Sequence, residues 1–307
     1  MPSGAGTIAL NVTRVGQRTR GREVRPVPWI VPSHQAPALF LKSWRPRWFS
    51  GLALVLGSLA PDLEFIVPVR KEAILGHTVA GQILFTVPVV LVLYVLTTDL
   101  VIPWLVPYLS RSWHDLAALE RPRGRAWWGV AVSGALGGLT HIVLDGFTHG
   151  EASGGWAVAF FPLLSLKVLS PLGLLPVHDV LQIVLTVVLG AAALDAWRRI
   201  AGQRLLWSWR SRSPRPVLAA SPAWRRRVLR WLTACGALGV AAVLFFKPAA
   251  SLGQAVELAA YGCLDGIAAG ILLGATTHRI LGARVRRDSA LEAATRASVL
   301  LPGEGSA

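Results

Sequence analysis

Residues 79–98 are VAGQILFTVPVVLVLYVLTT, twenty consecutive positions without a charged side chain. A helix of about 20 apolar residues is long enough to cross the hydrocarbon core of a bilayer. Pro88 predicts a kink within this helix, and membrane helices tolerate such kinks. This stretch therefore predicts a membrane-spanning helix.

Five further apolar stretches lie along the 307-residue chain, at 51–67, 127–145, 177–197, 228–246 and 256–281. Only 15% of all residues are charged, against about 25% in a typical soluble domain. The first stretch is the weakest, because it is short and Pro61-Asp62 interrupts it. The short tract 101–109 is expected at the membrane interface. The sequence predicts an all-α, polytopic transmembrane helical bundle with about six membrane segments, a multi-pass protein of the cell membrane.

The positions of Lys and Arg predict the orientation of this bundle. Alternate segments between the apolar stretches carry 27 and 4 of the 31 basic residues. Cytoplasmic loops of membrane proteins are enriched in Lys and Arg, so both termini are predicted to be cytoplasmic. The same rule explains the net charge of +15. We therefore expect membrane lipids, with attraction to anionic headgroups, and no nucleic acid as partners.

Charge and hydropathy also divide the chain into parts. The expected order is a disordered basic extension, a four-segment membrane core with the polar residues, a basic cytoplasmic linker, two transmembrane helices and a disordered basic tail. These parts cover residues 1–27, 28–200, 201–227, 228–281 and 282–307.

The most informative polar motif is THIVLDGFTHG at 140–150, near the end of the third stretch. His141, Asp145 and His149 are spaced four residues apart, so a continuous helix would place them on one face. Two histidines and a carboxylate are suitable ligands for zinc or another divalent transition metal. Hydrogen bonding between helices is an equally open explanation of this pattern taken alone.

The predicted topology brings other polar residues to the same level of the membrane. Asp62 follows the first stretch and His77 precedes the second, both on the non-cytoplasmic side with the motif. His34 lies on the opposite side if the first stretch crosses, and joins the others if that stretch only dips into the membrane. His178-Asp179, at the start of the fourth stretch, is expected to cap the helix or to support a ligand.

Several short motifs in this order carry a family resemblance. They are Pro32-Ser33-His34, Gly57-Ser58-Leu59-Ala60-Pro61-Asp62, Gly76-His77-Thr78, Gly138-Leu139-Thr140-His141, Asp145-Gly146-Phe147-Thr148-His149-Gly150 and Gln182. Together they resemble a bacterial membrane-protein family of unknown function. That family is in turn similar to inner-membrane proteins predicted to be metal-dependent hydrolases. The resemblance covers residues 28–200. The sequence has His77-Thr78 where the related hydrolases have His-Ser, and no evident His-Arg pair shortly before it.

The resemblance implies a set of metal ligands and a chemistry. The expected ligands of a zinc or manganese ion are His34, His77, His141, Asp145 and His149, with Asp62 as a further candidate. Asp62 or Asp145 is the expected catalytic residue, which would orient a water molecule or act as general base. We expect a hydrolase that opens near the outer leaflet and acts on a lipid or lipid-linked phosphoester, an unidentified small molecule being the wider class. The alternatives are a transporter and a structural or partner-binding membrane protein.

Overall fold

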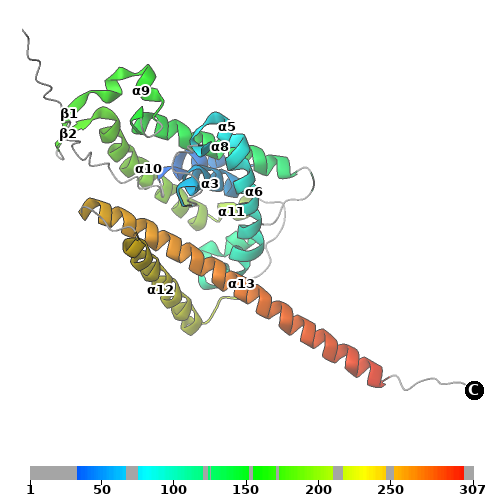
Figure 1. Ribbon diagram of the computed structural model, residues 1–307. Helices are drawn as coiled ribbons and strands as arrows, with labels where there is room; N and C mark the ends of the chain where they lie inside the picture. Colours follow the sequence, from blue (N-terminus) through cyan, green and yellow to red (C-terminus); the bar gives the residue numbers. More distant parts are fainter. Residues whose placement is uncertain are drawn as a thin grey trace, which may run out of the picture.

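The computed structural model describes residues 33–66, 75–119, 124, 126–151, 155–170, 173–209, 217–246 and 252–300. The predicted basic extension at 1–27 lies outside these residues. Apart from a short antiparallel hairpin of β1 (Lys167–Ser170) and β2 (Gly173–Pro176), the described elements are helices. The predicted all-α helical bundle is thus confirmed (Figure 1).

Five helical runs are long and apolar enough to cross a membrane, which fits a multi-pass membrane protein. They are Val79–Tyr108, α8 (Ala126–Thr148), α10 (Val177–Gly202), α12 (Pro222–Phe246) and Leu258–Ala283 within α13 (Leu252–Leu300). The first run joins α5 (Val79–Gly81), η3 (Gln82–Thr86), α6 (Val87–Leu96), η4 (Thr97–Val101), α7 (Ile102–Leu105) and η5 (Val106–Tyr108). The tract 101–109 therefore continues this helix almost to its end instead of forming a separate interfacial segment.

The first apolar stretch is shorter than a span. Its helical part, Gly51–Asp62, consists of α3 (Gly51–Leu59) and η1 (Ala60–Asp62), followed by α4 (Leu63–Ile66). Twelve helical residues extend about 18 Å, whereas the hydrocarbon core is about 30 Å thick. The number of crossings and the side of each terminus stay predictions.

α2 (Gln35–Trp44) packs against α3 and forms a short helical hairpin with it. One face of α2 lies along the second half of α10, where Ala36 and Leu39 contact Ala193 and Ile200. The indole of Trp197 also donates a hydrogen bond to the Gln35 side chain, 2.9 Å away. α2 runs along α10 toward the C-terminal end of that helix, and α3 runs back beside α2. The hairpin therefore begins and ends at the same level of the bundle.

α3 and α8 run parallel in very close contact, which small residues make possible. A Cβ atom added at Gly57 would collide with the Gly134 carbonyl oxygen, and one at Gly137 would collide with that of Leu54. The Ser50 amide donates to the Ser133 hydroxyl at 2.9 Å. This packing places the end of α3 beside the second half of α8, where His141 and Asp145 lie.

The last two helices form a separate hairpin. α12 and α13 pack through Gly239, Gly262 and Gly266, at which added Cβ atoms would meet the facing backbone. α13 touches the rest of the bundle at η4 and α7 and then extends far past it (Figure 1). Its helix continues to Leu300, through most of the segment 282–307 in which the sequence analysis expected a disordered tail. The polar residues of the candidate site lie in the other part of the bundle.

Candidate metal centre

Four polar side chains converge where η1, α8 and the turn before α5 meet. Asp62, His77, His141 and Asp145 each offer one ligand atom, and these four atoms all lie within 4.8 Å of one another. Asp62 ends η1, His77 lies in η2 (Leu75–His77), and the other two lie one turn apart on α8. The structure thus brings together these four residues, which the sequence analysis had placed at one level.

The spacing of the four ligand atoms matches a metal coordination shell. His141 Nε2 lies 3.0 Å from Asp145 Oδ2 and 3.4 Å from Asp62 Oδ1. His77 Nε2 lies 3.4 Å from Asp145 Oδ2 and 3.6 Å from Asp62 Oδ1. Four atoms arranged tetrahedrally about 2.1 Å from a zinc ion would be about 3.4 Å apart. These four His–Asp distances therefore lie close to those expected for ligands of one divalent ion.

The orientation of His141 favours a ligand role. This side chain is fully buried, and its Nδ1 donates a hydrogen bond to the Ser58 carbonyl oxygen at 2.8 Å. That bond leaves the lone pair on Nε2, the atom that faces the two carboxylates. His141 Nε2 and Asp62 Oδ2 are buried and make no hydrogen bond. Buried polar atoms normally have partners, so a bound cation explains both.

Two side chains hold the turn that carries His77. The Glu64 carboxylate accepts hydrogen bonds from the Leu75 and Gly76 amides at 3.0 and 2.8 Å. The buried Gln82 amide donates to the carbonyl oxygens of Gly76 and Thr78 at 2.5 and 3.2 Å. Neither residue was predicted from the sequence, although Gln82 stands out as a polar residue within an apolar stretch.

His77 also shows how negative this site is. Burial alone lowers the pKa of its imidazole, but the Asp145 and Asp62 carboxylates act in the opposite sense and raise that pKa to about 8. Two carboxylates in a largely buried site therefore stabilise positive charge at His77, and they would stabilise a metal cation in the same way.

His34 joins the centre from the opposite direction. It caps the start of α2, and its Nε2 lies 3.0 Å from Asp145 Oδ1. Its ring stacks on the His141 ring with centroids 4.5 Å apart. The α2–α3 hairpin places His34 and Asp62 in the same site, the arrangement expected if the first stretch only dips into the membrane.

His149 lies at the rim, just beyond the last residue of α8. Its Nδ1 is 3.6 Å from Asp145 Oδ1 and its Nε2 is 3.5 Å from the Gln182 side-chain nitrogen. His178 lies nearby but bonds to the Leu164 carbonyl oxygen at 2.9 Å and contacts Asp179 at 3.3 Å. These contacts indicate a local structural role for His178 and a closer link to the centre for His149.

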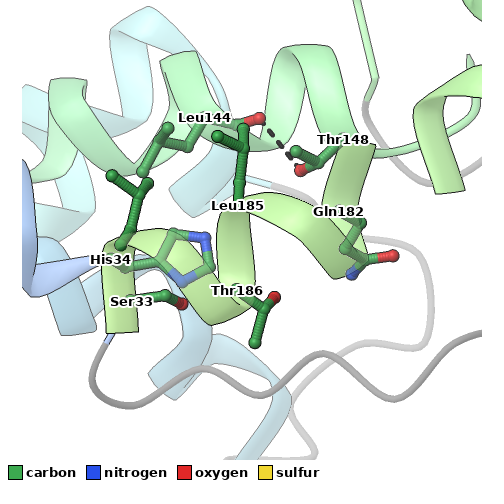
Figure 2. A pocket seen from close by; sticks show the side chains of 8 residues that line it. Ser33, His34, Leu144, Thr148, Gln182, Leu185 and Thr186 are labelled. Atoms are coloured by element: carbon green, nitrogen blue, oxygen red, sulfur yellow. Dashed lines mark hydrogen bonds between the residues drawn. The ribbon is translucent and has the colours of Figure 1, made fainter. Parts of the chain in front are cut away.

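A small cavity adjoins His34 between the start of α2, α8 and α10 (Figure 2). Its volume of about 20 Å³ is sufficient for a water molecule. It is lined by Ser33, His34, Leu144, Thr148, Gln182, Leu185, Thr186 and Leu189. Polar and apolar side chains share this lining.

Comparison with known proteins assigns the chain to a family without assigning an activity. No curated protein and no solved structure matches it significantly. A family model described as a domain of unknown function, DUF4184, matches residues 29–281, which include the polar cluster and all but the last two residues of the five long apolar runs. The chain therefore belongs to the DUF4184 family, a family of domains of unknown function.

Proposed function

We infer that this protein is a membrane-embedded, metal-dependent hydrolase that acts on a lipid or lipid-linked phosphoester. The observation that carries this inference is the buried donor set of Asp62, His77, His141 and Asp145, whose atoms are spaced as ligands of one divalent ion. Zinc and manganese both suit imidazole and carboxylate ligands. The resemblance to proteins predicted to be metal-dependent hydrolases points the same way.

The residues of the site have different roles in the proposed hydrolysis. A divalent metal supplies a Lewis acid that polarises the phosphoryl oxygen and increases the acidity of water. His77, His141, Asp145 and one oxygen of Asp62 would hold the metal. Asp62 is the better general base, because its Oδ2 makes no hydrogen bond whereas both Asp145 oxygens contact imidazoles. Water oxygen bonds to phosphorus while Asp62 accepts its proton, the ester P–O bond breaks, and Asp62 passes that proton to the departing oxygen, which leaves as the alcohol.

The position of the site supports a lipid substrate. The cavity beside His34 combines Leu144, Leu185 and Leu189 with polar groups. α8 and α10, which form two of its walls, are both long enough to span a membrane. A substrate with a phosphoester at one end and an apolar chain at the other suits a polar site beside membrane-spanning helices.

Metal content and hydrolysis of the detergent-purified full chain test this function. We expect about one or more zinc or manganese ions per chain, and metal-dependent hydrolysis of a lipid phosphomonoester, a lipid phosphodiester or a prenyl diphosphate. His141→Ala and Asp145→Ala should abolish both, whereas His114→Ala, on η6 (Arg111–Ala118), should change neither. A well-folded protein that binds no added metal would rule the proposal out. Uptake by proteoliposomes without hydrolysis would favour transport instead.

A further inference from the structure

The two oxygens of Asp145 face two different groups of histidines. Oδ2 lies 3.0 Å from His141 Nε2 and 3.4 Å from His77 Nε2, within the four-residue group described above. Oδ1 lies 3.0 Å from His34 Nε2 and 3.6 Å from His149 Nδ1. Asp145 is therefore placed between two sets of nitrogen ligands instead of within one.

The second set has the spacing of ligands around an ion. Ligand atoms about 2.1 Å from a shared metal are about 3.0–3.4 Å apart in octahedral or tetrahedral geometry. His34 Nε2 lies within this range of Oδ1, whereas His149 Nδ1, which also contacts the Thr148 hydroxyl at 3.1 Å, lies just outside it. His34 comes from α2 and His149 from the end of α8, so two independent elements deliver them to one carboxylate oxygen. A carboxylate with one ion on each oxygen is a bridging ligand, and metal pairs in hydrolytic sites are about 3.5–4 Å apart.

The surroundings leave room for a further ligand on this side. The water-sized cavity is lined by His34 together with the polar residues Ser33, Thr148 and Gln182 (Figure 2). Catalytic metal sites have fewer protein ligands than structural ones and keep a position open for water or substrate. Three protein ligands next to a polar cavity have this arrangement.

Charge also favours a second cation when the substrate is a phosphoester. Asp62 and Asp145 carry a formal charge of −2 with neutral histidines, which one divalent ion would cancel. A second divalent ion leaves a surplus of +2 opposite a phosphate ester anion. The centre would then bind the phosphate group while excluding neutral esters.

We propose that His34, His149 and Asp145 Oδ1 form a second divalent-cation site, which Asp145 bridges to the first site in a binuclear centre for phosphoesters. The proposal rests on the proposed function for its first site. His34 and His149 are then ligands in their own right and not residues that merely orient Asp145.

Manganese binding to the full chain in detergent tests this proposal. After loading with Mn²⁺ and removal of excess ion, the wild type should hold two ions per chain. His34→Ala and His149→Ala should each hold one, and the control His114→Ala should hold two. Electron paramagnetic resonance should show the exchange-coupled signal of a Mn²⁺ pair in the wild type and isolated Mn²⁺ in both ligand variants.

The possible outcomes separate the two proposals. No bound ion in folded wild type contradicts the proposed function itself. One ion in the wild type, unchanged by His34→Ala and His149→Ala, overturns the binuclear centre but leaves a mononuclear hydrolase. Two magnetically isolated ions also overturn it. If His34→Ala does not elute as a folded monodisperse protein, His34→Gln, which keeps a polar side chain of similar reach, takes its place.

Discussion

His141 connects three parts of the site through one imidazole ring. Its Nδ1 is fixed by the Ser58 carbonyl oxygen, its Nε2 faces Asp62 and Asp145, and its ring stacks on His34. The four-residue spacing of the motif predicted that His141 and Asp145 share a helix face. The role of Ser58 was not predictable, because it depends on a backbone carbonyl 83 positions away in the sequence.

His141→Ala should therefore destabilise the protein even when no metal is present. The variant leaves the buried Ser58 carbonyl without its donor and removes an imidazole from beside two carboxylates. Loss of such a buried partner costs about 1–3 kcal/mol. Thermal unfolding in detergent with a chelator should show a lower midpoint than for His114→Ala. Equal midpoints for the two variants would contradict the assigned hydrogen bond.

The stability of the folded protein is expected to depend on pH through Lys42, which lies outside the long apolar helices. Its ammonium group donates to the Pro46 and Phe49 carbonyl oxygens and lies 5.0 Å from the Trp209 ring. Burial lowers its pKa from 10.5 to about 8. The unfolded chain therefore binds this proton more tightly than the folded chain between pH 8 and 10.5, so the Lys42 contribution to stability increases with pH across that window.

The comparison of wild type with Lys42→Met isolates this contribution. Between pH 7.5 and pH 9.5 the midpoint of thermal unfolding should rise relative to that of Lys42→Met, by roughly 2–4 °C for each 1 kcal/mol. The difference between the two proteins, measured in one detergent, removes the pH effects of all other groups. A constant difference across this range would show that Lys42 is as solvated in the folded protein as in the unfolded one.

At the scale of elements, the contact between α3 and α8 positions the centre. Gly57 faces Gly134 so closely that Gly57→Ala would force the helices apart. We expect this change to cost about 1–3 kcal/mol and to weaken metal binding, because Ser58 lies in the last turn of α3 and Asp62 follows it. Gly129→Ala is the matched control, since nothing lies within 4 Å of its new Cβ atom. It should be neutral or stabilise α8 by up to about 1 kcal/mol.

Thermal unfolding and metal affinity of the two glycine variants check this prediction together. Equal effects of Gly57→Ala and Gly129→Ala would mean that the helices do not approach as closely as described. The close approach itself had no clear signal in the sequence. Glycines at 57, 134 and 137 are suited to helix contact. The apolar pattern predicts the helices and the span between α3 and α8, but it does not indicate which helices pack against each other.

The turn before α5 is a second element on which the centre depends. Glu64→Gln should keep the fold but leave one acceptor where two amides, those of Leu75 and Gly76, now bond to two oxygens. His77 would be held less firmly, and loss of such a supporting contact typically weakens metal binding about 10–100-fold. Metal titration should show this loss for Glu64→Gln and none for Asp195→Asn, on the exposed side of α10. Unchanged affinity would make the Glu64 contacts irrelevant to the centre.

For the whole molecule, apolar length was sufficient to predict a helical bundle with long spans. It was not sufficient for the α2–α3 hairpin, because α2 is short and its partners on α8 and α10 are more than 90 residues away. The tip of the hairpin agrees with the charge pattern, whereas the predicted cytoplasmic N-terminus would require a further crossing before His34. Lys42, Arg45 and Arg47 lie at its tip, where Arg45 and Arg47 share a groove with Ser208 and Trp209 beyond the end of α10. The basic tip thus lies beside the segment 198–230, which carries ten Arg residues and is predicted to be cytoplasmic.

Cysteine labelling tests this arrangement and its orientation. In a background without Cys235 and Cys263, single cysteines at Trp48, Ser208 and Leu169 mark the hairpin tip, the segment just beyond α10, and strand β1, respectively. Trp48 and Ser208 line one groove, whereas α10 separates both from the exposed Leu169. A membrane-impermeant maleimide should label Leu169→Cys in intact cells, and Trp48→Cys and Ser208→Cys only after permeabilisation. The opposite labelling pattern at all three positions would mean that the protein has the inverse orientation in the membrane. Labelling of Trp48→Cys but not Ser208→Cys in intact cells would mean that the hairpin tip is not beside α10, and His34 would then have no route into the centre.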